Sequence, residues 1–501
     1  MEKKLAFSLG CFFIAVFIAQ GQGISNNWLM GYASWGGLPY GQTKFDFNTG
    51  ILVSSFDSIE MDFKHTHANI SDSMGNLLFY TNGNYIANTI NDTMQNGAGL
   101  TPGAYANYAY DGFGIPQIAL ILKKPGGSSL FNLFHATVDN FPPTNSVYSY
   151  HIYSTTVDIS MNGGLGAVIS KNQPIINDTL ITGKIVACKH SNGIDWWIIV
   201  LRANSNKIYK ILYSSSGTFF SDQNIGVYKT FFGGQAKFSS DGKKFAVFNP
   251  QFTTTGMLEV FDFDRCSGTF SNADSIVFPP TYGFNCGLEF SPNSNLLYVT
   301  TGDSIFQFDV ISPNIAASKT FVAAYDGFYQ PGAPALQVGL SFPQLAPDGK
   351  IYITSGNSTS YMGTIENPDV AGIGCNVMQH SILLPAYSYN TLPNHPNYFL
   401  GCDTTQTTCP CLTTGIDYQD GEIKATAIPN PNNGVFTLHF AVQNKSGVLE
   451  VYDVMGNVVL KNYVAPWSQY KRVNIEDLPG GIYFCKLKWG NATGSIKVIK
   501  Q

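Results

Sequence analysis

The chain has 501 residues, a formal net charge of −5 and 12% charged residues, against about 25% in an average folded protein. This charge balance, without long Lys/Arg clusters, excludes the basic surface that nucleic-acid binding requires. Aromatic residues reach 14%, with 50 glycines and 25 prolines, a composition that favours strands joined by tight turns over long solvated helices.

Residues 1–23 are typical of an export signal peptide. Lys3 and Lys4 form a basic start, Leu5 to Ala19 is apolar, and Ala19-Gln20-Gly21 offers small residues for cleavage. The apolar run of about 15 residues is shorter than the roughly 20 that a membrane span needs. We therefore expect residues 1–23 to be removed and the mature chain to carry no transmembrane segment.

Three similar hairpin signatures recur in the middle of the chain, at residues 238–248, 290–300 and 345–354. Each has an apolar strand end, a polar turn with Asp-Gly or an equivalent, and then an alternating strand. They start 52 and 55 residues apart, close to the roughly 40–50 residues of common propeller repeats. Weaker versions occur at 70–81, 124–128 and 192–200.

This spacing predicts an all-β fold in which residues 24–402 form a six- or seven-bladed β-propeller. Pairing of segments 28–60 and 365–400 would close the ring and remove exposed strand edges. A tandem of β-sandwiches is the alternative. Helices should be nearly absent, because no apolar stripe of period 3.6 has caps at both ends.

Residues 403–424 are rich in Thr and Cys and are predicted to form a linker. Of nine cysteines, eight remain once Cys11 leaves with the signal peptide, and an even number in an exported protein suggests disulfides. Cys409 and Cys411 are too close for an easy mutual bridge, so each should pair elsewhere. The sequence leaves the other pairings open.

The pattern of residues 425–501 predicts a small Ig-like β-sandwich. Alternating strands are expected at 435–441, 447–453, 470–475, 481–487 and 494–500, with turns at 453–457 and 478–481. Short strands at this spacing, separated by Gly/Pro turns, are typical of such sandwiches.

Four short segments of this unit occur in a fixed order up to the C-terminus. Their marker residues are Pro429, Asn430, Pro431, Gly434, Tyr452, Asp453, Gly456, Leu478, Pro479, Gly481, Tyr483 and Lys497. In order and spacing they resemble the type A sorting domain of the type IX secretion system. The resemblance implies Sec-dependent export to the periplasm, then passage through the outer-membrane machinery to the medium or the cell surface.

Segments 76–83, 163–166, 190–197, 261–266 and 392–398 resemble recurrent segments of a family of propeller-like secreted bacterial proteins. This second resemblance implies a fold and a location and adds nothing about chemistry.

Few residues stand out as functional. Trp196 and Trp197 are candidate ligand contacts, because an aromatic face can stack on a sugar, although packing between blades is the default reading. Cys188 and His190 suggest a nucleophile and a base, but a disulfide or a buried thiol is favoured. His65 and His67 should share one face of a strand, where an exposed polar surface is favoured over a metal site.

The sequence therefore names no catalytic, cofactor-binding or metal-binding residue. The first hypothesis for the propeller is binding or adhesion to a glycan, a protein or a small ligand. The alternative is a hydrolase or lyase acting on polysaccharide or peptide at the central channel. Two or three acids or histidines converging on the channel mouth would favour the enzyme, and an aromatic, uncharged channel would favour binding.

Overall fold

The structure, a computed structural model, describes residues 23–501 except 110, 128, 140–146, 230–232, 252–253, 282–284, 404–407, 410, 412–424, 441–442, 444–445, 465–467, 469 and 491. The predicted signal peptide and most of the predicted linker thus lie outside the described residues. The described part is nearly all β-sheet, as expected. Its helical segments are α1 (Ala104–Tyr108) and short 3-10 turns at Gly23–Ser25, Ser34–Gly36, Asn162–Gly164, Ala316–Ser318 and Gly372–Cys375.

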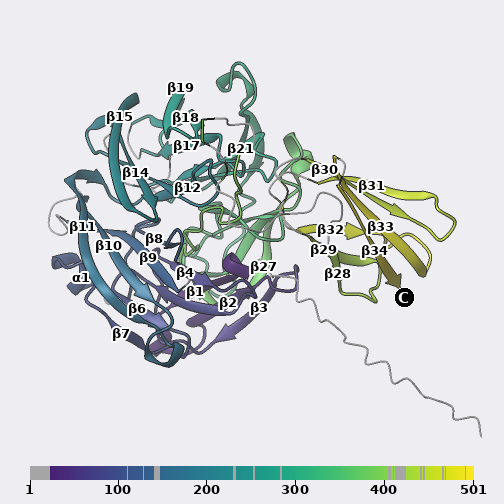
Figure 1. Ribbon diagram of the computed structural model, residues 1–501, viewed down its shortest axis with the longest axis horizontal. Coiled ribbons are helices and arrows are strands. Elements are labelled where there is room, and N and C mark those ends of the chain that lie inside the picture. The colour runs from purple at the N-terminus through teal and green to yellow at the C-terminus, as the bar shows by residue number, and fades with distance from the viewer. Residues whose placement is uncertain are drawn as a thin grey trace, which may run out of the picture.

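Seven antiparallel blades follow one another along residues 27–388, and blades 2 and 3 are joined at their outer strands into one eight-stranded sheet (Figure 1). Blade 1 contains β1 (Asn27–Tyr32), β2 (Gly41–Asp46) and β3 (Val53–Asp57). Blade 2 contains β4 (Ala68–Ser71), β5 (Leu77–Thr81), β6 (Tyr85–Asn88) and β7 (Thr93–Ala98). Blade 3 contains β8 (Ala119–Lys123), β9 (Leu130–Ala136), β10 (Tyr148–Asp158) and β11 (Ala167–Ile181).

Blade 4 contains β12 (Val186–Lys189), β13 (Trp196–Leu201), β14 (Ser205–Ser214) and β15 (Gly217–Lys229). Blade 5 contains β16 (Ala236–Phe238), β17 (Lys244–Asn249), β18 (Gly256–Asp264) and β19 (Thr269–Phe278). Blade 6 contains β20 (Gly287–Phe290), β21 (Leu296–Thr300), β22 (Ser304–Asp309) and β23 (Thr320–Ala324). Blade 7 contains β24 (Pro343–Leu345), β25 (Ile351–Ile353), β26 (Thr359–Ile365) and β27 (Val377–Ser388).

The first strand of each blade lies against the first strand of a neighbouring blade, as in β1 with β4, β4 with β8, and β16 with β20 and then β24. These inner strands surround the axis of a seven-bladed propeller, which confirms the predicted fold class. The recurrent hairpins are confirmed too, since each joins the first two strands of its blade. Blades 2 and 3 also touch at their outer edges through Gln95 and Ala167.

The two ends do not pair as strands, so that expectation is wrong; the ring closes mainly by side-chain packing, with one backbone hydrogen bond from Tyr387 N–H to Pro39 O at 2.8 Å. Blades 1 and 7 remain separate sheets, and they share one apolar cluster. In it, the ring of Tyr352 from blade 7 lies 5.8 Å from Trp28 and 5.9 Å from Phe45 of blade 1. Large buried aromatic rings supply enough apolar contact to hold the two sheets without a shared strand.

After blade 7, residues 390–401 run along the axis of the propeller. We call this stretch the channel segment. The side-chain amide of Asn394 donates to the carbonyl oxygens of Ala119 in blade 3 (3.0 Å) and Ile185 at the start of blade 4 (2.8 Å). The Tyr398 hydroxyl donates to Ile121 O at 2.9 Å. The channel segment is therefore bonded directly to the inner strands of the propeller.

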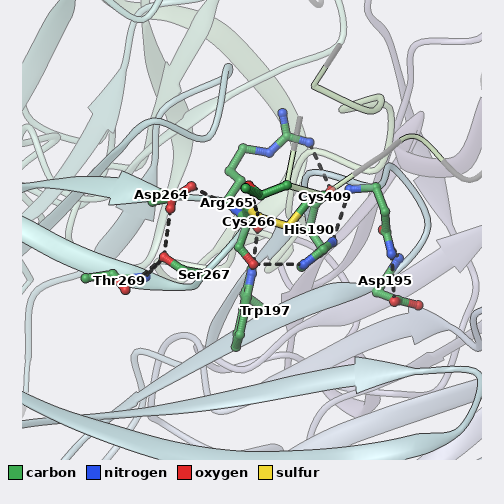
Figure 2. The surroundings of a disulfide bond; sticks show 11 residues. His190, Asp195, Trp197, Asp264, Arg265, Cys266, Ser267, Thr269 and Cys409 are labelled. Atoms are coloured by element: carbon green, nitrogen blue, oxygen red, sulfur yellow. Dashed lines mark hydrogen bonds between the residues drawn. A yellow bond between two sulfur atoms is a disulfide. The ribbon is translucent and has the colours of Figure 1, made fainter. Parts of the chain in front are cut away.

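Two disulfides and a buried arginine fix the place where the channel segment leaves the axis. Cys266, in the turn between β18 and β19, is bonded to Cys409 (Figure 2), and Cys402 is bonded to Cys411. Cys409 and Cys411 thus pair elsewhere, as expected. Beside Cys266, the Arg265 guanidinium donates to the carbonyl oxygens of Lys189, His190 and Gly401.

The C-terminal residues form a separate two-sheet sandwich, seen in yellow at the side of the propeller (Figure 1). Its strands are β28 (Ala425–Ile428), β29 (Val435–Phe440), β30 (Gly447–Tyr452), β31 (Val458–Val464), β32 (Tyr470–Asn474), β33 (Gly481–Trp489) and β34 (Ala492–Lys500). Strands β28 and β31 were not anticipated. The sandwich has an apolar core of its own, which contains no residue of the propeller.

The histidines contradict the expected exposed strand face. His67 is only 2% exposed, and residues 64–67 are not in a strand, because the backbone here bonds to the loop at Phe113. Burial lowers the pKa of His65 to about 4 and that of His67 well below its usual value. Burial also lowers the pKa values of His135 and His395 to about 3.

These four buried histidines predict that the protein loses stability in mild acid. The unfolded chain takes up protons below pH 6.5 or so, whereas the folded chain does not until its much lower pKa values, so unfolding becomes easier as the pH falls. Each histidine should remove about 1.4 kcal/mol of unfolding free energy per pH unit in this window. Asp348 has the opposite effect, because burial raises its pKa to about 6 and the folded chain therefore takes up this proton before the unfolded chain does as the pH falls. Its contribution offsets that of one histidine. Urea unfolding at pH 7 and pH 5 measures the effect, and equal free energies would contradict it.

Candidate functional site

A cavity with a volume of about 170 Å³ lies at one end of the propeller axis. We call it the channel-mouth cavity. Its walls come from inner strands, from the turns that follow them, from the channel segment and from the C-terminal sandwich. The residues on which the argument depends are Lys237, Glu289, Gln344, His395, Ser468 and Tyr470.

Three polar side chains from three consecutive blades meet in the wall of this cavity. Lys237 of β16 forms an ion pair with Glu289 of β20 at 3.0 Å, with side chains only 8% and 6% exposed. The same ammonium donates to the Gln344 side-chain oxygen of β24. Glu289 also accepts the backbone N–H groups of Phe290 and Leu345, both at 3.0 Å. A buried ion pair needs such additional hydrogen bonds, because desolvation otherwise outweighs the attraction.

Sequence reasoning missed these three residues, although the repeat contains a signal for them. Each stands immediately before the apolar residue that begins a recurrent hairpin: Lys237-Phe238, Glu289-Phe290 and Gln344-Leu345. A polar residue at the same place in three repeats is notable on an otherwise buried inner strand. That the three would meet depends on the ring geometry, which the repeat alone does not give.

His395 of the channel segment also lines the cavity. Its Nε2 lies 3.1 Å from Asn69 O and 2.9 Å from Asn69 Oδ1; facing two acceptors, it carries the proton. The pKa of His395 is lowered to about 3, mainly by burial and further by Lys237, so the ring is neutral at pH 7. Its Nδ1 is a buried acceptor with no hydrogen-bond partner in the described structure.

Aromatic rings complete the lining, from Trp28, Phe238, Phe399 and Tyr470. Glu289 is the one acid among the described lining residues, and Lys237 balances its charge. No group of three or more His, Cys, Asp or Glu in the described part of the chain could hold a metal ion. The lining of the cavity is therefore mainly apolar and aromatic, with one buried ion pair, and it is close to neutral.

Of the other candidate residues, Cys188 also lines this cavity, whereas Trp196 and Trp197 are not among its described lining residues. Trp196 and Trp197 are 2% and 6% exposed. Trp196 packs beside Tyr398, and the Trp197 Nε1–H donates to Arg265 O at 2.8 Å (Figure 2). Their role as ligand contacts stays a prediction. Burial raises the pKa of Cys188 to about 12, so this thiol is not activated as a nucleophile.

The marker residues of the C-terminal sandwich form turns and cross-links. The Asn430 side chain bridges to β34, donating to Lys497 O and accepting from Ile499 N, each at 2.8 Å. Asp453 accepts the N–H groups of the following turn, and the Tyr483 hydroxyl donates to Pro479 O at 2.7 Å. Gly434 has φ +108° and lies close to Glu476, which follows β32 in the chain. A Cβ added at Gly434 would lie 2.8 Å from the Cα of Glu476.

Residues 426–501 match the family model of the secretion system C-terminal sorting domain. The match confirms the predicted type IX sorting domain. The chain is thus an exported protein, which is secreted or attached to the outer cell surface, and the secretion machinery is its partner. No helix in the described part of the chain is long and apolar enough to span a membrane.

No curated protein matches the chain in sequence. Among solved structures, a protein from Lactobacillus plantarum is 12% identical, with 73% of this chain and 98% of that chain covered and a TM-score of 0.41. A functionally unknown protein from Desulfotomaculum acetoxidans has the same identity and coverage, with a TM-score of 0.37. A quinoprotein alcohol dehydrogenase-like protein from Bacteroides thetaiotaomicron is 10% identical over 73% and 75% of the two chains, with a TM-score of 0.35. At these scores the fold assignment rests on strand topology alone.

Breaking the buried pair should destabilise the propeller strongly. Glu289→Gln leaves the Lys237 ammonium without its counter-charge and should lower the unfolding free energy by about 3–5 kcal/mol. The double variant Lys237→Met/Glu289→Gln should lose less than the sum of the single variants. Denaturant titrations measure all three. As a matched control, Asp262→Asn breaks the more exposed pair with Lys244 and should cost under about 1 kcal/mol. Equal losses at both pairs would contradict the argument.

Proposed function

We propose that the protein is an exported binding protein, and that its channel-mouth cavity holds a small neutral ligand rich in hydroxyl groups, such as a saccharide. The observation that carries the proposal is the buried array of Lys237, Glu289 and Gln344 in the wall of the cavity. It offers donors and acceptors whose charges cancel, so it suits hydroxyl groups better than a charged ligand.

The aromatic lining supports the same ligand class. Trp28, Phe238, Phe399 and Tyr470 border the cavity, and aromatic faces pack against the apolar faces of sugar rings while polar groups bind the hydroxyls.

The same cavity gives little support to the hydrolase or lyase alternative. Glycoside cleavage uses two carboxyl groups, one on each side of the scissile bond. The described lining contains one carboxylate, Glu289, and it is held by Lys237 and by two backbone N–H groups. A carboxylate fixed in this way is suited to positioning a ligand.

We place the working parts at residues 24–402 for the propeller, 403–424 for the linker and 425–501 for the sorting domain. On this division, truncation after residue 424 should leave the propeller folded but retained in the periplasm. Fractionation of cells and medium from the native host tests this, with the full-length chain as control. Truncated protein in the medium at the full-length level would contradict the export role of the C-terminal sandwich.

The ligand proposal can be tested on a glycan array. The protein should be produced as the whole chain with a protease site between residues 413 and 423, and cut after folding. We expect the protein to bind one class of saccharide. Gln344→Ala should weaken this binding at least about tenfold, because it removes one hydrogen bond, which contributes about 1.4 kcal/mol. Gln223→Ala removes a comparable amide bonded to Phe270 far from the cavity and should bind normally. Absence of any saccharide binding, or unchanged binding by Gln344→Ala, would refute the proposal.

A further inference from the structure

The C-terminal sandwich is docked on the propeller through β29 and β32. The Asn26 side-chain amide and the Tyr470 hydroxyl exchange hydrogen bonds of 3.2 and 3.3 Å, although they are 444 positions apart in the chain. The Tyr470 ring in turn packs edge-on against His439 of β29 at 4.5 Å. Both strands thus present side chains to the propeller.

A second contact needs glycine. Gly50 follows β2 with φ +75°, and its carbonyl accepts the Thr437 hydroxyl at 3.3 Å. A Cβ at this position would lie 2.6 Å from His439 Nε2 and 2.8 Å from Thr437 Cγ2. The backbone of blade 1 and the face of β29 are therefore packed as closely as a folded interior.

Charges also face each other across this contact. Burial lowers the pKa of Lys471 on β32, while the carboxylate of Asp369 in blade 7 acts in the opposite direction. Burial raises the pKa of Asp369, and Lys471 opposes that shift. The two groups are thus partly buried and of opposite sign, which fixes the orientation of docking more than its strength.

The docked sandwich borders the channel-mouth cavity. Tyr470 and Ser468 belong to its lining, beside Ser240 and Pro347 from the turns that follow the inner strands. Among the residues that the structure describes, no buried apolar cluster contains residues of both the sandwich and the propeller. Interfaces of this kind within a chain open and close far more easily than a shared core.

We propose that the C-terminal sandwich is a lid, so that the channel-mouth cavity takes its ligand only after the sandwich has moved away. This inference rests on the proposed function of the same cavity and adds its regulation. While the sandwich is docked, the Tyr470 side chain occupies one wall. The binding site is therefore closed until the two parts of the chain separate.

A thiol placed in the cavity tests the lid without any ligand. Ser240→Cys puts a cysteine in the cavity wall, and the rate at which N-ethylmaleimide modifies it can be followed by peptide mass spectrometry. The free cysteines Cys188, Cys286, Cys375 and Cys485 are all buried and are resolved as separate peptides. The chain carries the protease site between residues 413 and 423, and the released sandwich is removed by size exclusion.

Removal of the sandwich should speed modification of residue 240 by about tenfold or more, the range expected when two sites are coupled by 1–3 kcal/mol or so. In the uncut chain, Tyr470→Ala should also speed the reaction. Tyr463→Ala is the matched control, because Tyr463 lies on β31 of the other sheet and is 51% exposed; it should leave the rate unchanged.

Equal rates before and after removal of the sandwich, or no effect of Tyr470→Ala, would overturn the lid. These outcomes are separable from failure of the proposed function. If the protein binds a saccharide but residue 240 reacts at the same rate with and without the sandwich, the binding role stands and the lid is rejected. Faster modification without saccharide binding would keep the lid and reject the ligand class.

Discussion

The molecule depends on filling the axis of its ring. Seven sheets around a centre leave inner-strand carbonyl groups facing the axis, and buried polar groups without partners are costly. The channel segment supplies donors to these carbonyl groups. Asn394 donates to Ala119 O and Ile185 O, and the Tyr398 hydroxyl donates to Ile121 O. Its far end is held by Arg265 and by the bond from Cys266 to Cys409.

The channel segment also decides where a ligand can bind. The channel segment occupies part of the channel, and a cavity remains beside it, where Lys237, Glu289 and Gln344 converge near His395. These side chains are bonded to one another or to backbone groups, so their positions are set before a ligand arrives. Such preorganisation favours affinity because little order has to be gained on binding.

The C-terminal sandwich combines independence with contact. Its core is separate from that of the propeller, as a transferable sorting unit requires, yet Tyr470 bonds to Asn26 and borders the channel-mouth cavity. The sequence predicts two separate parts, and the structure adds a hydrogen-bonded interface between them. Through that interface, the domain that directs export also borders the channel-mouth cavity.

The sequence by itself determined the class of fold, the hairpins of the blades, the Ig-like sandwich and the route of export, because turn residues, alternation of apolar side chains and the sorting segments are local patterns. It did not determine how the ring closes, that His65 and His67 are buried, or that Lys237, Glu289 and Gln344 meet. Those features join residues 50 to more than 300 positions apart, as Tyr352 and Trp28 do. Only tertiary packing brings such residues together, since no local preference records which blades become neighbours.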